Sequence, residues 1–432
     1  FMKEMTWREL GVELPRIMLP ETGADMAKWA VVACDQYTSE PEYWQRVEEF
    51  AGGAPSALRL ILPEALLSED PAENADREAK IIGAMEAYLQ GGVFKTLQKG
   101  AMLVRRYLPC GVRTGLVLAF DLERYDYKRG SASLIRATEG TVEERVKARL
   151  SLRRRALIEL PHILMLIDDP KKTVIEPLVG LSKSQAYDFE LMERGGRITG
   201  DFLAEKDLKG ARAALSALAG EQIGRFGKPL LLYAMGDGNH SLAAAKAVWE
   251  EIKPTLTEEE REDHPCRFAL AELVNVHDDG ILFEPIHRLL TGVRPGAAGE
   301  IAYILAEQNG DVSIGPAGKD HPEFAHVLPF VSKEGEGAIT VPAPANRLAV
   351  ATLQNALEDY AKRTGAKLDY IHGDETLKNL AMREGSLGFL LPAMEKADLF
   401  ATVILEGALP KKTFSMGEAQ EKRYYLEARA LR

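Results

Sequence analysis

The residues best suited to chemistry stand in one short run, Gly236 to Ser241, which reads Gly-Asp-Gly-Asn-His-Ser. An apolar stretch of strand length precedes this run, and an Ala-rich stretch with helical periodicity follows it. A strand, a glycine turn and a helix in this order leave backbone N–H groups unpaired at the positive end of the helix dipole, where phosphate or carboxylate binds. The side chains of Asn239, His240 and Ser241 could add to those donors. Asp-Gly and Asn are also ordinary turn and cap residues, so a plain turn stays an open alternative.

A second junction near the N-terminus has the same layout. Residues 29–34 are an apolar stretch that predicts a strand, and Asp35 follows directly. Ser39 and Glu42 have the spacing of a capping box, which predicts a helix over residues 40–50. Because ligands bind outside the carboxyl ends of strands in open α/β sheets, we expect both junctions to meet in one cleft. Acidic residues are common in loops, so Asp35 on its own is a weak signal.

Arginines surround a third predicted helix start. A loop around Glu139 separates an extended segment that ends at Arg136 from a helix that begins with the capping box Thr-Val-Glu-Glu and ends near residue 161. Arg145, Arg149 and Arg153 lie four residues apart on one face of that helix. Most of this row is typical of a solvated face. Arg136, Glu139 and Arg145 flank the helix start, where an arginine can bind phosphate through two hydrogen bonds.

Two further groups of cations lie in the C-terminal third. His287 and Arg288 are adjacent polar residues in an apolar segment, and Lys411, Lys412 and Thr413 follow a predicted strand near the end of the chain. A buried histidine is more often a satisfied core residue than a catalyst. Lysines beside a hydroxyl could hold phosphate, and a solvent-facing turn is an equally open reading.

Composition sets the class of protein. The chain has 432 residues, of which 46% are hydrophobic, and a formal net charge of -11, which disfavours a general nucleic-acid binder. No apolar run approaches the ~20 residues that span a bilayer, and the N-terminus has no signal-peptide pattern. Cys34, Cys110 and Cys266 form no metal-ligand pair, so we expect a cytoplasmic protein without membrane or nucleic-acid partners. Its expected partner is a small-molecule substrate, and a homodimer is left open.

A Gly/Pro-rich segment at residues 291–299 is the best candidate for a domain boundary. We therefore expect a main α/β region over residues 1–292 and a C-terminal α+β region over residues 293–432 that packs back on it. Hairpins are expected around residues 109–111 and 195–196. The Walker pattern GxxxxGK[ST], the Rossmann pattern GxGxxG, HExxH and paired CxxC are all missing, so any phosphate is handled outside the commonest folds.

The run Asp237-Gly238-Asn239-His240-Ser241 resembles the central motif of an uncharacterised bacterial family known as domain of unknown function ten-fifteen, whose pattern is Asp-Gly-His-His-Arg. The resemblance extends over most of the chain, through the Asp35 junction and the segments described above. Two of the five motif positions differ. Ser241 replaces an arginine that would bind phosphate, so Arg136, Arg145 or Lys412 would have to substitute for it.

The core of that family is similar to the fold shared by ParB-type nucleotide-binding domains, sulfiredoxin and free-serine kinases. The resemblance thus implies an α/β (mixed α+β) protein, with mixed sheets and flanking helices, a ParB/sulfiredoxin-like core and a smaller C-terminal α+β region. It also implies transfer of phosphate from ATP or ADP to a small hydroxyl compound, with free serine the first candidate. Phosphoryl transfer depends on positioning and charge neutralisation more than on covalent chemistry.

Roles for individual residues follow from this resemblance. His240 and the turn amides would hold the phosphates, Asp237 would hold Mg²⁺, and Asp35 or Glu139 would accept the hydroxyl proton, while Lys412 would offset the developing charge. The other expected phosphate or nucleotide ligands are Gly236, Gly238, Asn239, Ser241, Arg136, Arg145, His287, Arg288, Lys411 and Thr413.

Three alternatives remain open from the sequence. The first is a regulatory protein that binds a nucleotide or metabolite without turning it over. The second is sulfiredoxin-like redox repair, which needs a cysteine in or near the motif; Asn239 occupies that place, and Cys34 at an apolar strand end is more typical of an inert thiol. The third is ParB-like DNA partition, which the acidic balance disfavours.

Overall fold

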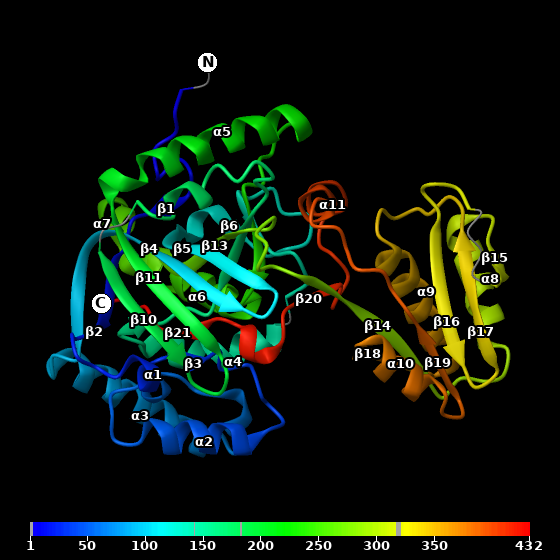
Figure 1. The fold of residues 1–432 in the computed structure, drawn as a ribbon, viewed down its shortest axis with the longest axis horizontal. Helices are drawn as coiled ribbons and strands as arrows, with labels where there is room; N and C mark the ends of the chain where they lie inside the picture. Colours follow the sequence, from blue (N-terminus) through cyan, green and yellow to red (C-terminus); the bar gives the residue numbers. More distant parts are fainter. Residues whose placement is uncertain (1–2, 142, 182–183, 317–320) are drawn as a thin grey trace. The chain divides into compact units, whose positions relative to one another are not determined.

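The computed structural model describes the whole chain except residues 1–2, 142, 182–183 and 317–320 (Figure 1). The chain divides into two compact units. Unit 1 comprises Phe1–Leu282 and Gly417–Arg432, and unit 2 comprises Phe283–Met416.

This division differs from the boundary expected between residues 292 and 293. Strand β14 (Phe283–Thr291) belongs to unit 2 because it pairs with β18 (Lys367–His372) and β19 (Ser386–Phe389). The last residues belong to unit 1 because β21 (Tyr424–Tyr425) pairs with β3 (Val31–Val32) near the start of the chain. The C-terminal segment therefore belongs to unit 1, because it pairs with strands that are distant in the sequence.

Unit 1 is built on an eleven-stranded mixed sheet. Its main path runs in the order β10-β11-β4-β5-β13-β9-β12-β7-β6, with β1 paired to β5 and β2 paired to β4. The pairs β13–β9, β12–β7 and β6–β7 are parallel and the others are antiparallel. The strands are β1 (Val12–Glu13), β2 (Arg16–Pro20), β4 (Phe94–Leu108), β5 (Gly111–Asp121), β6 (Tyr125–Asp126), β7 (Ile135–Arg136), β9 (Leu164–Ile167), β10 (Gln185–Leu191), β11 (Gly196–Ala204), β12 (Tyr233–Asp237) and β13 (Phe268–Asn275).

Helices flank this sheet, as the sequence predicted for the fold class. Figure 1 shows α5 on one side of unit 1 and α2 and α3 on the opposite side. One continuous cluster of buried apolar side chains joins the strands to the helices, with Phe120, Leu273 and Trp249 among its members. The helices are α1 (Met26–Trp29), α2 (Pro41–Ala51), α3 (Pro71–Gln90), α4 (Glu143–Arg155), α5 (Lys209–Phe226), α6 (Asn239–Ile252) and α7 (Glu258–Asp263), and a short strand β8 (Ile158–Glu159) pairs with β22 (Arg429–Ala430).

Three local predictions in unit 1 differ from the structure in detail. The expected strand over residues 29–34 is only β3, because α1 occupies the preceding residues and ends at Trp29. Helix α2 lies where the capping box placed it, but Glu40 is its N-cap and no side chain caps it. Helix α4 ends at Arg155, ahead of β8, rather than near residue 161. The two predicted hairpins, β4–β5 and β10–β11, are confirmed.

Unit 2 contains a smaller, seven-stranded sheet in the order β15-β17-β16-β19-β14-β18, with β20 paired to β14. The apolar run at residues 399–405, which the sequence favours as a strand, is helix α11, because a short apolar run does not distinguish the two periods. The remaining elements are β15 (Ser313–Gly315), β16 (His326–Ser332), β17 (Gly335–Val341), β20 (Phe414–Met416), α8 (Ala297–Asn309), α9 (Ala349–Thr364), α10 (Asp374–Ala381) and α11 (Asp398–Glu406).

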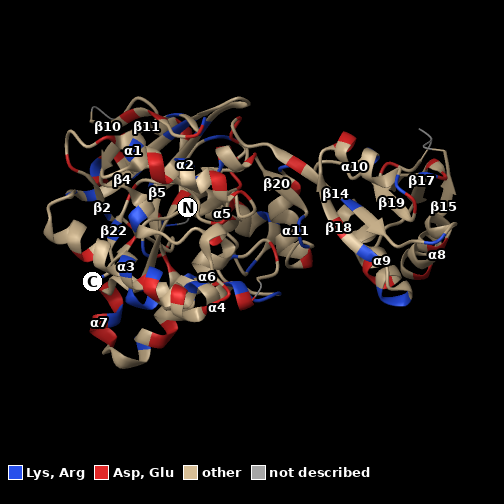
Figure 2. Cartoon of the chain, turned by 90° about the horizontal axis from the view of Figure 1, so that it is seen from below, with Lys and Arg blue, Asp and Glu red and all other residues tan. Residues whose placement is uncertain are grey.

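Acidic and basic residues are interspersed over the helices of unit 1 (Figure 2). Arg154 of α4, for example, pairs with Glu251 of α6 at 2.6 Å. In the described part of the chain, every helix is too short or too polar to cross a lipid bilayer.

Candidate functional site

The glycine turn forms the junction between β12 and α6. Strand β12 includes Gly236 and Asp237, and Gly238 follows with φ 85°, in the left-handed region. A Cβ at Gly238 would lie 2.9 Å from Cγ1 of Ile163, so only glycine fits there. The Gly238 N–H donates to Oδ1 of Asp237 at 2.8 Å, and α6 then begins at Asn239 with no side-chain cap. The sequence order strand, glycine turn, helix is present as predicted. The N–H groups of Ser241 and Leu242 both donate to the carbonyl of Gly238, at 3.0 and 3.1 Å.

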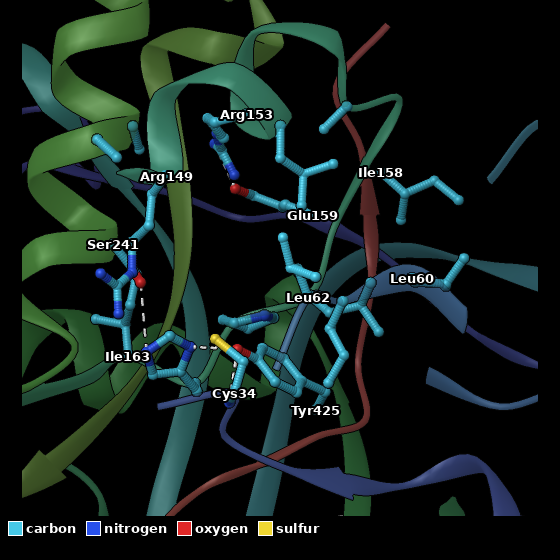
Figure 3. Close-up of a pocket in the computed structure, with 18 of the residues that line it drawn as sticks. Cys34, Leu60, Leu62, Arg149, Arg153, Ile158, Glu159, Ile163, Ser241 and Tyr425 are labelled. Carbon is cyan, nitrogen blue, oxygen red and sulfur yellow. Dashed lines mark hydrogen bonds and ion pairs between the residues drawn. The ribbon is translucent and has the colours of Figure 1, made fainter. Parts of the chain in front are cut away.

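The Asp35 junction lies against this turn. Asp35 is half-buried, and its Oδ2 lies 3.9 Å from Nε2 of His162, whose same nitrogen lies 3.3 Å from Oγ of Ser241. Tyr425 holds the other side of the ring, with its hydroxyl 2.8 Å from Nδ1. The imidazole of His162 therefore connects the two junctions, and Cys34 and Ser241 line the same cavity (Figure 3).

Cations from α4 set the electrostatics of this cluster. Arg149 pairs with Glu64, and its Nη2 lies 4.0 Å from Oδ2 of Asp35. Burial lowers the pKa of His240 from 6.5 to about 4, and the positive charges of Arg149 and Arg145 act in the same direction. His240 is thus a neutral imidazole at neutral pH beside two arginines.

The carboxyl of Asp35 is under opposing influences. Burial acts to raise its pKa, but the charges of His162 and Arg149 and a hydrogen bond from Gln36 hold the pKa below its ordinary value. Asp35 is therefore ionised at neutral pH and can accept a proton only as a weak base.

A lysine from the C-terminal segment reaches the end of β12. Nζ of Lys422 lies 3.5 Å from Oδ2 of Asp237. Two residues further along, Oδ1 of Asn239 is buried and has no hydrogen-bond partner among the described residues. A buried acceptor without a partner suits a ligand hydroxyl or a metal-bound water.

Of the three candidate residues around the loop before α4, two lie at the same end of the sheet as Asp237 and one does not. Strand β7 runs parallel to β12, and the hydroxyl of Thr138 donates to the carbonyl of Met235 at 2.8 Å, so Glu139 follows β7 at the same end of the sheet as Asp237. Arg145 is exposed near the start of α4. Arg136 instead donates to the carbonyls of Ser133 and Pro229, which precede β7 and β12.

The guanidinium of Arg136 thus lies at the opposite end of these strands from Asp237. The structure does not bring it to the cluster, which corrects the expectation that Arg136 is a phosphate ligand beside the start of the helix at residues 143–155.

The cations of the C-terminal third lie in unit 2, where they have structural partners. Nε2 of His287 lies 2.9 Å from Asp374, and its Nδ1 accepts from the N–H of Leu391 at 3.1 Å. Thr413 donates to the carbonyl of Pro410 at 2.8 Å.

Arg288 is fully buried and donates to Gln354 and to the carbonyls of Ile286, Lys411 and Lys412. The ammonium of Lys412 lies 5.9 Å from the ring centroid of Tyr370. The adjacent cations His287 and Arg288, singled out as candidate phosphate ligands, are explained by packing within unit 2.

Sequence reasoning missed four members of the cluster: Glu64, His162, Lys422 and Tyr425. It also treated Arg149 as part of a solvated face. The four-residue spacing of the arginines was a usable signal for Arg149, because it places Arg149 on the same face of the helix as Arg145, which the sequence had already named as a candidate. Nothing in the local sequence distinguishes the other four, since they reach the site through pairings between distant segments.

The side chains near the turn can be compared with those that bind Mg²⁺ in other proteins, because the family resemblance implies a Mg²⁺ ion at Asp237. The described residues contain no group of three or more His, Cys, Asp or Glu side chains that could hold a metal ion. Mg²⁺ in nucleotide sites is bound by one or two carboxylates, with phosphate oxygens and water completing the shell. Asp237 could supply such a carboxylate, and the chain offers no cage made of protein ligands alone among its described residues.

Comparison with known proteins identifies a family for the chain and several solved structures of low similarity. A family model described as "Protein of unknown function (DUF1015)" matches residues 18–369. No curated protein shows significant sequence similarity to the chain.

Among solved structures, a mutant free serine kinase with ADP has a TM-score of 0.39 and 11% identity, over 73% of this chain and 92% of its own. A conserved hypothetical protein from Pyrococcus furiosus has a TM-score of 0.36 and 11% identity, over 71% and 93%. C-terminally truncated SbnI from Staphylococcus aureus has a TM-score of 0.35 and 8% identity, over 70% and 82%.

Proposed function

We propose that this chain, which belongs to the DUF1015 family of proteins of unknown function, is a small-molecule phosphotransferase. The donor is ATP or ADP, and the acceptor is a small hydroxyl compound, with free serine the first candidate. One observation carries the proposal: the start of α6 faces two arginines of α4, whose charges help to keep His240 neutral, and the ionised Asp35 lies beside them. An anion site and a proton acceptor therefore adjoin each other.

The anion half of the site consists of the glycine turn and its cations. Backbone N–H groups at the start of α6, together with a neutral His240, can donate to phosphate oxygens. Ser241 stands where the family motif has an arginine, and Arg149 and Lys422 supply positive charge in its place. Lys422, rather than Lys412, is the lysine that lies within unit 1 beside Asp237.

The acceptor half centres on Asp35. As the acceptor oxygen forms its bond to phosphorus and the bond to the leaving phosphate oxygen breaks, the hydroxyl proton passes to the Asp35 carboxylate. His162 fixes the surroundings of this carboxylate, because Tyr425 and Ser241 hold its ring from both sides. Mg²⁺ near Asp237 would neutralise charge on the phosphates.

Turnover assays test the proposal directly. Purified protein with ATP and Mg²⁺, or with ADP and Mg²⁺, is mixed with free serine and a panel of small alcohols, and phosphorylated product is measured by mass spectrometry. We expect product that disappears in Asp35→Asn, while nucleotide binding measured by calorimetry persists. Product formation that is unchanged in both Asp35→Asn and Arg149→Ala would contradict the assigned roles.

A regulatory nucleotide-binding protein is the second candidate. It is favoured by the ion pairing of Arg149 with Glu64 and by the lowered pKa of Asp35, which makes that carboxylate a weak base. A binder without turnover predicts that ATP or ADP raises the unfolding temperature while no product forms. Binding stabilises by RT ln(1 + [L]/Kd), so even a modest ligand shifts the transition at high concentration.

A further inference from the structure

Unit 1 holds an apolar cavity of about 170 Å³ directly beside the Asp35–His162–Ser241 cluster. Its walls come from elements far apart in the sequence, which converge in Figure 3. Helices α3 and α4 supply Met85 and Leu152, and strands β8 and β13 supply Ile158 and Leu270. The segment ahead of α3 supplies Leu60 and Leu62.

Charged groups on the wall are already paired. Arg153 lies 2.7 Å from Glu159, and Glu159 also pairs with Arg429 and accepts from the N–H of Leu270. Burial raises the pKa of Cys34 to about 12, so its thiol is a neutral part of the wall. Because these wall groups are already paired or neutral, they need no charged partner. A ligand in this cavity would therefore place an uncharged, apolar part against them.

One end of the cavity is polar. Oγ of Ser241 and Nε2 of His162 lie there 3.3 Å apart, and the hydroxyl of Tyr425 lies between Nδ1 of His162 and the N–H of Cys34 (Figure 3). A hydroxyl group at this end would meet both donors and acceptors, while the rest of the molecule would contact only carbon.

The size and lining of the cavity favour its use as a binding site for an apolar molecule. Protein interiors are close-packed, with few spaces larger than a water molecule, and an apolar cavity of this size can take up an apolar molecule. Leu67, which also lines the cavity, is 44% exposed. An exposed apolar residue on the cavity wall provides contact for an apolar molecule that arrives from solvent.

We propose that this cavity receives the apolar body of the phosphate acceptor, so that the acceptor is an amphipathic alcohol rather than free serine. A body of roughly six to eight carbon atoms fits, because a cavity of about 150 Å³ accommodates benzene. The acceptor role rests on the proposed phosphotransferase function, whereas binding of the alcohol in the cavity does not.

Binding is tested without nucleotide, using 1-hexanol and benzyl alcohol as probes and NMR titration as the readout. We expect Leu152→Trp to weaken both by about tenfold or more, because each methylene excluded from the cavity loses its burial. Leu62→Trp fills the cavity from another wall and serves as a second variant. Lys147→Trp, at an exposed position on the same helix, is the matched control and should bind like the wild type. Far-UV circular dichroism and the urea unfolding transition verify folding in all three variants.

Alcohols that bind Leu152→Trp and Leu62→Trp as well as wild type, or that fail to bind folded wild-type protein, would overturn the cavity assignment. Turnover then separates the two proposals. An apolar alcohol should exceed serine in kcat/KM by about tenfold or more. Phosphorylation of serine but not of the alcohols would overturn this inference and support the phosphotransferase. Cavity binding with no phosphorylation of any compound would overturn the phosphotransferase and the acceptor role, leaving a binding site for apolar alcohols.

Discussion

The carboxylate of Asp237 lies 3.5 Å from the ammonium of Lys422, which joins the turn at the end of β12 to the last residues of the chain. Strand β21, two residues after Lys422, pairs with β3, just ahead of Asp35. The returning C-terminal segment thus passes between the two junctions and brings a cation to one of them. A ligand with phosphate groups at the start of α6 would meet this lysine.

Removal of that cation should weaken nucleotide binding. We expect Lys422→Ala to bind ADP about tenfold more weakly, since a charge-assisted hydrogen bond contributes about 1.5 kcal/mol or more. Isothermal titration calorimetry measures the change. Lys412→Ala is the comparison, because Lys412 belongs to unit 2 and lies over Tyr370. An equal loss of affinity in both variants would contradict the assignment of Lys422.

Local signals in the sequence were sufficient for one half of the site. Glycine is required at residue 238 by the left-handed backbone and the contact with Ile163, and the Ala-rich stretch after it has a single helical period. The Asp-Gly pair that predicts the turn and the Ala-rich stretch after it can both be read in the local sequence, so the junction was predictable. The mixed α/β class was expected from the resemblance that residues 237–241 carry, and the mixed sheet with flanking helices confirms it.

The other half depends on contacts between distant segments. His162 and Lys422 stand in sequences with no distinguishing pattern, and only the pairing of β9 with β12 and of β21 with β3 brings them to the turn. The opposite error concerns Arg288. A cation in an apolar segment suggested a ligand site, but Gln354 and three backbone carbonyls satisfy it, and those acceptors are invisible in the sequence.

The titration of His240 should report on the anion site. Its pKa of about 4 reflects burial and then the charges of Arg149 and Arg145, so Arg149→Ala should raise the pKa towards 6.5. Bound ADP should also raise it, because phosphate charge offsets the arginines. NMR of the imidazole protons over pH 3.5–8 measures both shifts. A pKa near 6.5 in the free wild type would contradict the described environment.

Stability should follow the same titration. Between pH 6.5 and about 4 the unfolded chain binds a proton at His240 that the folded chain does not. The contribution of this group is therefore complete above pH 6.5 and is lost as the pH falls towards 4. His240→Gln should make the free energy of unfolding fall less steeply across that window. Urea unfolding at a series of pH values measures this. If the free energy of unfolding falls equally steeply with pH in the variant and the wild type, groups other than His240 dominate.

Asp35 and Glu139 are the two candidate proton acceptors, and substitution distinguishes them. We expect Asp35→Asn to lower kcat by about 10²-fold or more, as is typical for loss of a general base, with little change in ADP affinity. Glu139→Gln should retain most activity, because Asp35 is the carboxylate adjacent to His162 and Ser241. The reverse pattern in kcat would assign the role to Glu139.

Arg288 should be required for the stability of unit 2 and not for nucleotide binding. Arg288→Met leaves the acceptors of Gln354 and three carbonyls buried without their donor, which should cost about 2–4 kcal/mol of unfolding free energy. All four tryptophans of the chain, Trp7, Trp29, Trp44 and Trp249, lie in unit 1. The urea transition followed by far-UV circular dichroism should therefore shift, while the transition followed by tryptophan fluorescence should not.

Arg363→Met is the matched control for that experiment. Arg363 pairs with Asp359 and Glu307 in unit 2, but all three side chains are solvent-accessible, so its loss should leave the unfolding transition close to that of the wild type. ADP binding should be equal in both variants. If Arg288→Met loses ADP affinity while its fluorescence transition is unchanged, Arg288 contributes to the nucleotide site, and the structural role assigned to it within unit 2 is incomplete.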